Sequence, residues 1–312
     1  MDEATRQGTS VQIKRTWRTR PTGSDARQHR GRVLFRLAPL ILLTVVCGCA
    51  RHRQNVGGLP LRHSVQTDQL LVLSDFQLSS NHPLFLDLLE LQKELTQTLQ
   101  LPKQGRQVVV YLFDNEQRYR KFLATAYPNL PPRRAYFVGT PHELAVFTFW
   151  GDRIQEDIRH EFTHGLLHSR LRNVPLWLDE GLAEYFEVAG HRAGRVNLEY
   201  ARWLSSSIAN GWRPDLQRLE KLYDISHMQR NDYQEAWGWV HYLLHGSPES
   251  RAVLLGYLSE LCDNPHPSLS FETKLAQVIP GFRDRYISYV ASLPMGGSNW
   301  TASAGPNVIR VR

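Results

Sequence analysis

The segment "RHEFTH", residues 159–164, places two histidines four residues apart, with a glutamate directly after the first. On an α-helix, residues four apart project side by side, so the imidazoles of His160 and His164 can reach a single metal ion. This spacing suits Zn²⁺, which takes nitrogen ligands in a tetrahedral shell. Glu161 is offset by one position and could lean over the open site of the ion, where it would take a proton from a zinc-bound water. These residues predict hydrolysis of a peptide bond.

A zinc site of this kind needs a third protein ligand. His168 continues the four-residue spacing, but three histidines on two turns of a straight helix cannot meet at one ion, because the outer pair would be about 12 Å apart along the axis. The segment "WLDEGLAEYFE", residues 177–187, is a better source, since Glu180 and Glu184 share a helical face. One glutamate could bind zinc, and the other could hold a ligand histidine through its second ring nitrogen. His168 is then expected at the surface or just behind the ligands.

The two segments together resemble the gluzincin branch of zinc metallopeptidases, which includes thermolysin-like enzymes and the aminopeptidase/leukotriene-hydrolase family. The closest resemblance is to bacterial peptidase MA-like domains. It extends over residues 65–290 in layout and is specific over residues 155–190. The resemblance implies Zn²⁺ as the cofactor and assigns its site as follows: ligands His160, His164 and Glu180, general base Glu161, and Glu184 as the residue that orients a ligand histidine. The interval between the second and third ligands, residues 165–179, is a few residues shorter than in the better-known families.

The segment "NDYQEAWGWVHYLLHG", residues 231–246, resembles the aminopeptidase helix that begins with a tyrosine. The resemblance assigns Tyr233 to stabilisation of the oxyanion in the tetrahedral intermediate. His227 and His241 are alternatives for the same role. The aminopeptidase motif that binds the free amine of the substrate has no counterpart near residues 139–147, so exopeptidase specificity is not implied.

Hydrophobic periodicity predicts the elements that position these residues. Strand-like segments at 64–75 and 106–114 alternate with helical segments at 82–101 and 115–127, and a hairpin-like strand pair follows at 134–140 and 143–150. Six helices are expected after that, at 153–170, 178–189, 195–209, 229–246, 249–262 and 280–292. The pattern predicts an α+β, zincin-like fold, with a small mixed sheet and an active-site helix followed by a mainly helical lobe. The strand at 143–150 could pair with an extended substrate backbone.

The distribution of charge argues against a nucleic-acid partner. The formal net charge of the 312 residues is +7, but residues 1–48 carry nine basic and three acidic side chains, which accounts for +6. The remainder is nearly neutral and has no electrostatic reason to bind phosphates.

The basic leader instead has the form of an export signal. An apolar run at residues 37–48 precedes "VCGC", residues 46–49, which resembles the lipobox of bacterial lipoproteins. We expect an exported protein on the periplasmic face of a cell envelope, anchored by a lipid on Cys49 or by the apolar segment. The predicted divisions are an export signal at 1–48, a tether at 49–62, a catalytic domain at 63–292 (sheet lobe 63–152, helical lobe 153–292) and a tail at 293–312.

Two functions fit these features. The first is a monomeric zinc peptidase that acts on peptides or proteins of the envelope. The second is a non-catalytic, zinc-containing binding module of the same fold. Glu161 favours the enzyme, because a module that only holds zinc has no use for it.

Overall fold

The structure, a computed structural model, describes residues 58–188 and 196–294. The predicted export signal, Cys49 and most of the predicted tether therefore lie outside the described residues. Five strands form one sheet in the order β1-β2-β3-β5-β4. The sheet is mixed and the class is α+β, as predicted.

The first two strands form a hairpin rather than the single strand predicted at 64–75. Strands β1 (His63–Gln66) and β2 (Leu70–Ser74) pair antiparallel. Between them Thr67 turns the chain, since its N–H donates to Leu70 O and its Oγ1 accepts from Leu70 N. The short polar run of residues 67–69 thus interrupts an otherwise apolar segment.

The predicted hairpin-like pair is confirmed, but its substrate-facing strand was assigned wrongly. Strand β5 (Leu144–Phe149) pairs parallel with β3 (Val108–Phe113) on one side and antiparallel with β4 (Ala135–Gly139) on the other. Because both edges of β5 are occupied by neighbouring strands, it cannot pair with a substrate backbone. Strand β4 is the edge of the sheet on this side.

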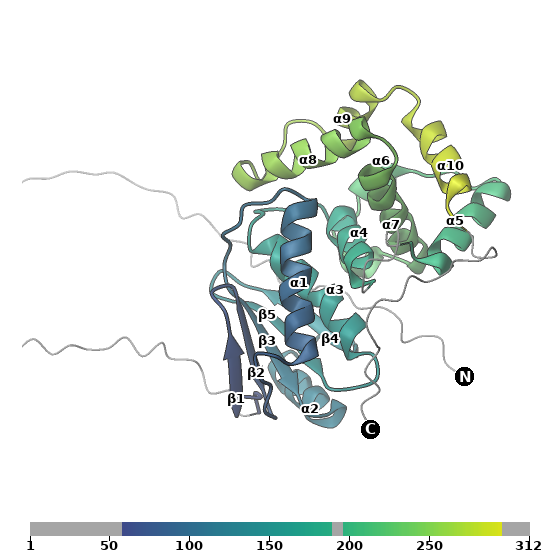
Figure 1. The fold of residues 1–312 in the computed structure, drawn as a ribbon. Helices are drawn as coiled ribbons and strands as arrows, with labels where there is room; N and C mark the ends of the chain where they lie inside the picture. The colour runs from purple at the N-terminus through teal and green to yellow at the C-terminus, as the bar shows by residue number, and fades with distance from the viewer. Residues whose placement is uncertain (1–57, 189–195, 295–312) are drawn as a thin grey trace, which may run out of the picture. The chain divides into compact units, whose positions relative to one another are not determined.

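Helices cover both faces of the sheet. Helices α1 (Pro83–Thr98) and α3 (Ile154–His168) lie on the face to which Val108, Val110 and Leu112 contribute (Figure 1). The alternate residues of β3 face α2 (Glu116–Ala126), where Phe113 contacts Tyr119 and Phe122. Both faces of β3 are therefore buried, one under α1 and α3 and the other under α2.

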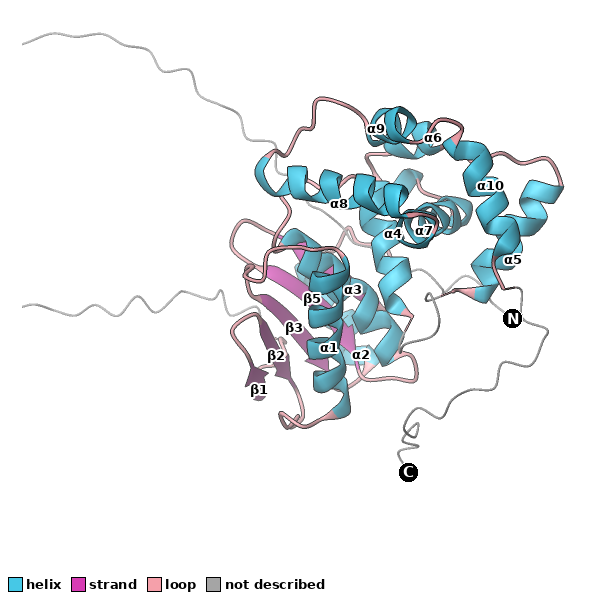
Figure 2. Ribbon diagram, turned by 45° about the horizontal axis from the view of Figure 1, so that its top comes forward, coloured by secondary structure: helices cyan, strands magenta, loops and turns pink. Residues whose placement is uncertain are grey.

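The remaining described elements are helical and gather beside the sheet layer (Figure 2). They are α4 (Leu176–Glu187), α5 (Leu198–Ala209), α6 (Leu216–Glu220), the 3-10 helix η2 (Ile225–His227), α7 (Arg230–His245), α8 (Pro248–Asp263), α9 (Phe271–Val278) and α10 (Phe282–Ser292). Six of the helices after residue 153 correspond to the predicted ones, within a few residues at each end. The short helices α6 and α9 were not predicted. Among the described helices, none has the length and apolar character needed to cross a membrane.

Two glycines set the positions of α3 and α4. A Cβ on Gly165, one residue after His164, would lie 2.7 Å from a methyl group of Val108, so α3 approaches β3 closely at this point. A Cβ on Gly181, one residue after Glu180, would lie 2.6 Å from the backbone oxygen of Ala236, so α4 crosses α7 there. Helix α3 therefore packs closely on β3 next to His164, and α4 packs closely on α7 next to Glu180.

A buried arginine joins the same helices. Arg159 donates to Asp87 of α1 at 2.7 Å and to the carbonyl oxygen of Phe186 of α4 at 3.1 Å. It directly precedes His160, so α3, α1 and the end of α4 are held together next to the first predicted ligand.

Candidate metal centre

The three predicted ligands converge between α3 and α4. Glu180 Oε2 lies 3.6 Å from His160 Nε2 and 3.8 Å from His164 Nε2. The three side chains are buried, with at most 2% of each residue exposed. Each residue offers one ligand atom, and these atoms all lie within 4.8 Å of one another.

These separations fit a shared metal ion. Ligands at the corners of a tetrahedron around Zn²⁺, at bond lengths of about 2.0–2.2 Å, are about 3.4 Å apart. The observed distances are close to this value and too long for direct hydrogen bonds. Both Nε2 atoms are buried and have no hydrogen-bond partner among the described residues. A buried polar atom in that state is costly unless something binds it, and a cation placed between the imidazoles and the carboxylate would do so.

On the His160 side, the second ring nitrogen is held by a glutamate that was not predicted. His160 Nδ1 lies 2.9 Å from Glu187 Oε2. Glu184, the predicted partner, accepts a hydrogen bond from Tyr200 of α5 at 2.9 Å, although its ligand atom also lies within 4.8 Å of those of His160 and Glu187. Glu180, Glu184 and Glu187 follow one face of α4 at spacings of four and three residues, a signal that the sequence contained.

On the His164 side, an aspartate joins two histidines. Asp179 Oδ1 lies 3.0 Å from His164 Nδ1, and its Oδ2 lies 2.8 Å from His168 Nε2. Asp179 is 1% exposed and directly precedes the third predicted ligand. His168 therefore lies behind the ligands, which is one of the two positions that its sequence spacing allowed.

The charges around the two imidazoles favour a cation. Burial lowers the pKa of His160, but the carboxylates of Glu180 and Glu187 raise it well above its ordinary value. For His164, burial likewise lowers the pKa, while Asp179 and Glu180 raise it. In both cases the surrounding carboxylates stabilise positive charge more than burial penalises it. The same field would stabilise a divalent metal ion.

Glu161 lies between α3 and the edge strand. Its Oε2 accepts a hydrogen bond from the backbone N–H of Phe137 in β4 at 2.7 Å, and its Oε1 is buried without a hydrogen-bond partner among the described residues. Burial raises the pKa of the Glu161 carboxyl, an effect that His160 and His164 partly oppose. One oxygen of this carboxylate is thus fixed by the backbone, and the other is left to accept a proton.

The candidates for oxyanion stabilisation are spread over the helical elements. Tyr233 is 1% exposed in the first turn of α7, the helix that packs on α4. His241 is buried in the same helix, where its Nδ1 lies 2.7 Å from the hydroxyl of Tyr289 and its ring contacts Trp237. His227 is exposed at the end of η2. The assignment of this role stays a prediction.

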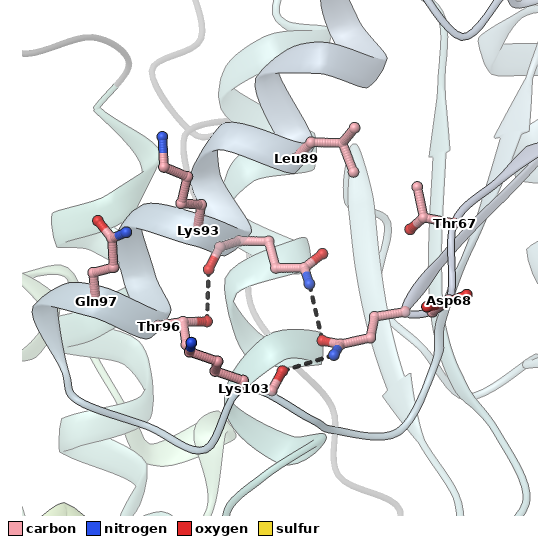
Figure 3. Close-up of a pocket in the computed structure, with 9 residues that line it drawn as sticks. Thr67, Asp68, Leu89, Lys93, Thr96, Gln97 and Lys103 are labelled. Carbon is pink, nitrogen blue, oxygen red and sulfur yellow. Dashed lines mark hydrogen bonds between the residues drawn. The ribbon is translucent and has the colours of Figure 1, made fainter.

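A pocket of about 430 Å³ lies apart from these residues, between the β1–β2 turn and α1 (Figure 3). Its floor is a chain of amides, in which Gln92 donates to Gln69 at 2.9 Å and Gln69 donates to the carbonyl oxygen of Lys103 at 2.7 Å. Its lining includes no residue of the metal centre.

Residues 155–264 match a family model described as "Protein of unknown function (DUF1570)". The match covers about a third of the chain, from α3 to just beyond α8, and includes every residue of the candidate centre but no strand of the sheet. No curated protein matched the chain.

Proposed function

We propose that the protein is a zinc-dependent peptidase of the gluzincin type, with a zincin-like arrangement of sheet and active-site helix. The observation that carries the proposal is the convergence of His160 Nε2, His164 Nε2 and Glu180 Oε2 beside the carboxylate of Glu161. Two nitrogen ligands and one carboxylate oxygen form the set expected for a catalytic zinc site, which keeps one coordination position for other ligands.

The chain's own residues supply binding, orientation and proton transfer. Bound Zn²⁺ would contribute Lewis acidity, which makes water a nucleophile at neutral pH and polarises a carbonyl group. Glu161 takes the proton of the attacking water on Oε1, while the Phe137 N–H holds Oε2 in place. Glu187 holds the outer nitrogen of His160 by a hydrogen bond, and Asp179 lies 3.0 Å from the outer nitrogen of His164; the inner nitrogens of both histidines face Glu180.

The expected substrates are peptides or proteins of a bacterial envelope. The proposed location is the periplasmic face of a membrane, with a lipid on Cys49 or the N-terminal apolar segment as the anchor. The protein would act as a monomer and without nucleic acid. These proposals rest on the leader and on the near-neutral remainder of the chain.

Glu161→Gln tests the mechanism. The amide cannot accept the proton, so hydrolysis of a random peptide library should fall by about 10²–10⁴-fold. The zinc content of the full-length protein should stay at that of the wild type, because Glu161 is not a ligand. Glu156→Gln, an exposed change in the first turn of the same helix, is the matched control and should cleave normally. Unchanged cleavage by Glu161→Gln would contradict the mechanism.

A non-catalytic zinc module is the second candidate, and the burial of the centre favours it. His160, Glu161, His164 and Glu180 are at most 2% exposed, whereas the pocket of Figure 3 lies elsewhere. This candidate predicts zinc in the wild-type protein without cleavage of any member of the library. The same experiment therefore separates the two functions.

A further inference from the structure

Helix α3 carries three histidines, His160, His164 and His168, and only His168 is not a predicted ligand. His168 nevertheless contacts Asp179, the residue that precedes the predicted ligand Glu180. Its Nε2 lies 2.8 Å from Asp179 Oδ2, and only 12% of its side chain is exposed. The other oxygen of Asp179 lies 3.0 Å from His164 Nδ1. A single buried carboxylate thus spans two imidazoles that are one helical turn apart.

The two contacts of Asp179 differ in geometry. His168 Nε2 is in hydrogen-bonding contact with Asp179 Oδ2, an oxygen that accepts hydrogen bonds when the carboxylate is ionised. Asp179 Oδ1 lies 3.0 Å from His164 Nδ1, a close polar contact whose geometry is not that of a hydrogen bond. The other ring nitrogen of His164, Nε2, faces Glu180 at 3.8 Å.

Strand β4 holds the same two imidazoles by ring contacts. The ring of Phe137 stacks on His168, with centroids 5.4 Å apart and an interplanar angle of 17°, and on His164 at 6.2 Å and 23°. Phe137 thus contacts both of the rings that lie against Asp179. Removing His168 would take away both a stacking partner of Phe137 and the donor that fixes Asp179 Oδ2.

We propose that His168 is a positioning residue of the candidate metal centre, which fixes Asp179 and through it holds His164 in the orientation that binds the metal. The proposal rests on the metal centre of the proposed function, but not on its catalytic activity. The competing explanation is that His168 only stabilises the last turn of α3, where a histidine interacts favourably with the helix dipole. That role would affect folding but not metal affinity.

The test uses the full-length protein and measures zinc affinity by competition with a chelator at fixed pH. His168→Ala should weaken zinc binding by about 10–100-fold, the range found when a residue that supports a ligand is removed. His168→Gln should restore most of the affinity, because its side-chain amide can still donate to Asp179. His142→Ala, an exposed change in the β4–β5 turn, is the control and should bind zinc like the wild type. The visible spectrum of the Co²⁺-substituted protein should change in His168→Ala and return towards the wild-type spectrum in His168→Gln.

Three results would overturn the proposal. The first is zinc affinity within about twofold of wild type in a folded His168→Ala protein, well below the expected range. The second is loss of the fold in both His168→Ala and His168→Gln, which would make the residue purely structural. The third is failure of the wild-type protein to bind zinc, which would remove the metal centre itself. Normal zinc binding without peptide cleavage would defeat the proposed peptidase but leave the role of His168 intact.

Discussion

The metal centre and the pocket of Figure 3 differ in what they offer a ligand. The pocket provides about 430 Å³ of space, and its lining includes two lysines and the amides of Gln69 and Gln92, which are joined by a hydrogen bond. The centre brings together two imidazoles and a carboxylate, all at most 2% exposed, on atoms within 4.8 Å of one another. Space alone therefore does not indicate where a metal ion could bind in this protein. The types and convergence of donor atoms do.

Removal of a predicted zinc ligand should have the largest effect on zinc affinity, and removal of a pocket residue should have none. A zinc-binding free energy of about 10–16 kcal/mol, divided over four ligands, is about 2.5–4 kcal/mol per ligand, so His164→Ala should weaken zinc binding by about 60–700-fold. Gln92→Ala, which removes an amide from the pocket, should leave zinc affinity unchanged. Chelator competition measures both. Equal loss in the two variants would mean that the centre is not where zinc binds.

The packing beneath the centre should show the next largest effect. Gly181→Ala places a Cβ 2.6 Å from the backbone oxygen of Ala236, and an overpacked contact of this kind costs about 1–3 kcal/mol. Gly256→Ala in α8 meets nothing within 4 Å and should instead stabilise the protein by about 0.5–1 kcal/mol. Denaturant unfolding of the metal-free proteins measures the free energy of unfolding, which should fall in Gly181→Ala and rise in Gly256→Ala. Stabilisation by Gly181→Ala would show that α4 and α7 are farther apart than described.

The residues behind His160 provide a finer test. Glu187→Gln should weaken zinc binding by about 10-fold, because the amide holds the His160 Nδ1 proton less strongly than the carboxylate does. Glu184→Gln should have a smaller effect, since the hydrogen bond of Glu184 is to Tyr200. Zinc affinities in the reverse order would support the partner assigned from sequence and contradict the observed contact.

The smallest effect is expected at the pocket. Lys93 is 61% exposed and pairs with Glu90 at 3.3 Å, an exposed ion pair that contributes about 0–1 kcal/mol. Lys93→Ala should therefore leave zinc affinity and peptide cleavage at wild-type levels. A loss of cleavage with normal zinc content would assign the pocket a part in substrate binding.

The sequence predicted the residues of the centre because the distances along the chain were short. His160 and His164 are related by one helical turn, and the same periodicity placed Glu180 and Glu184 on one face of the next helix. The choice of Glu180 as the ligand came from the family resemblance. The same periodicity identified most helices and the β4–β5 hairpin.

Features that depend on packing between distant segments could not be predicted in this way. Whether Glu184 or Glu187 reaches His160 depends on the crossing of α3 and α4, which Gly165 and Gly181 set through contacts with β3 and α7. The contact of Glu161 with β4 and the place of β5 inside the sheet depend on strand order, which alternating hydrophobicity does not encode.

The most direct test is the anomalous diffraction of crystals of the zinc-loaded full-length protein at the zinc absorption edge. We predict one peak per chain, about 2.0–2.2 Å from His160 Nε2, His164 Nε2 and Glu180 Oε2. A zinc ion bound elsewhere, or crystals of zinc-loaded protein with no peak between α3 and α4, would contradict the metal centre on which the proposed function depends.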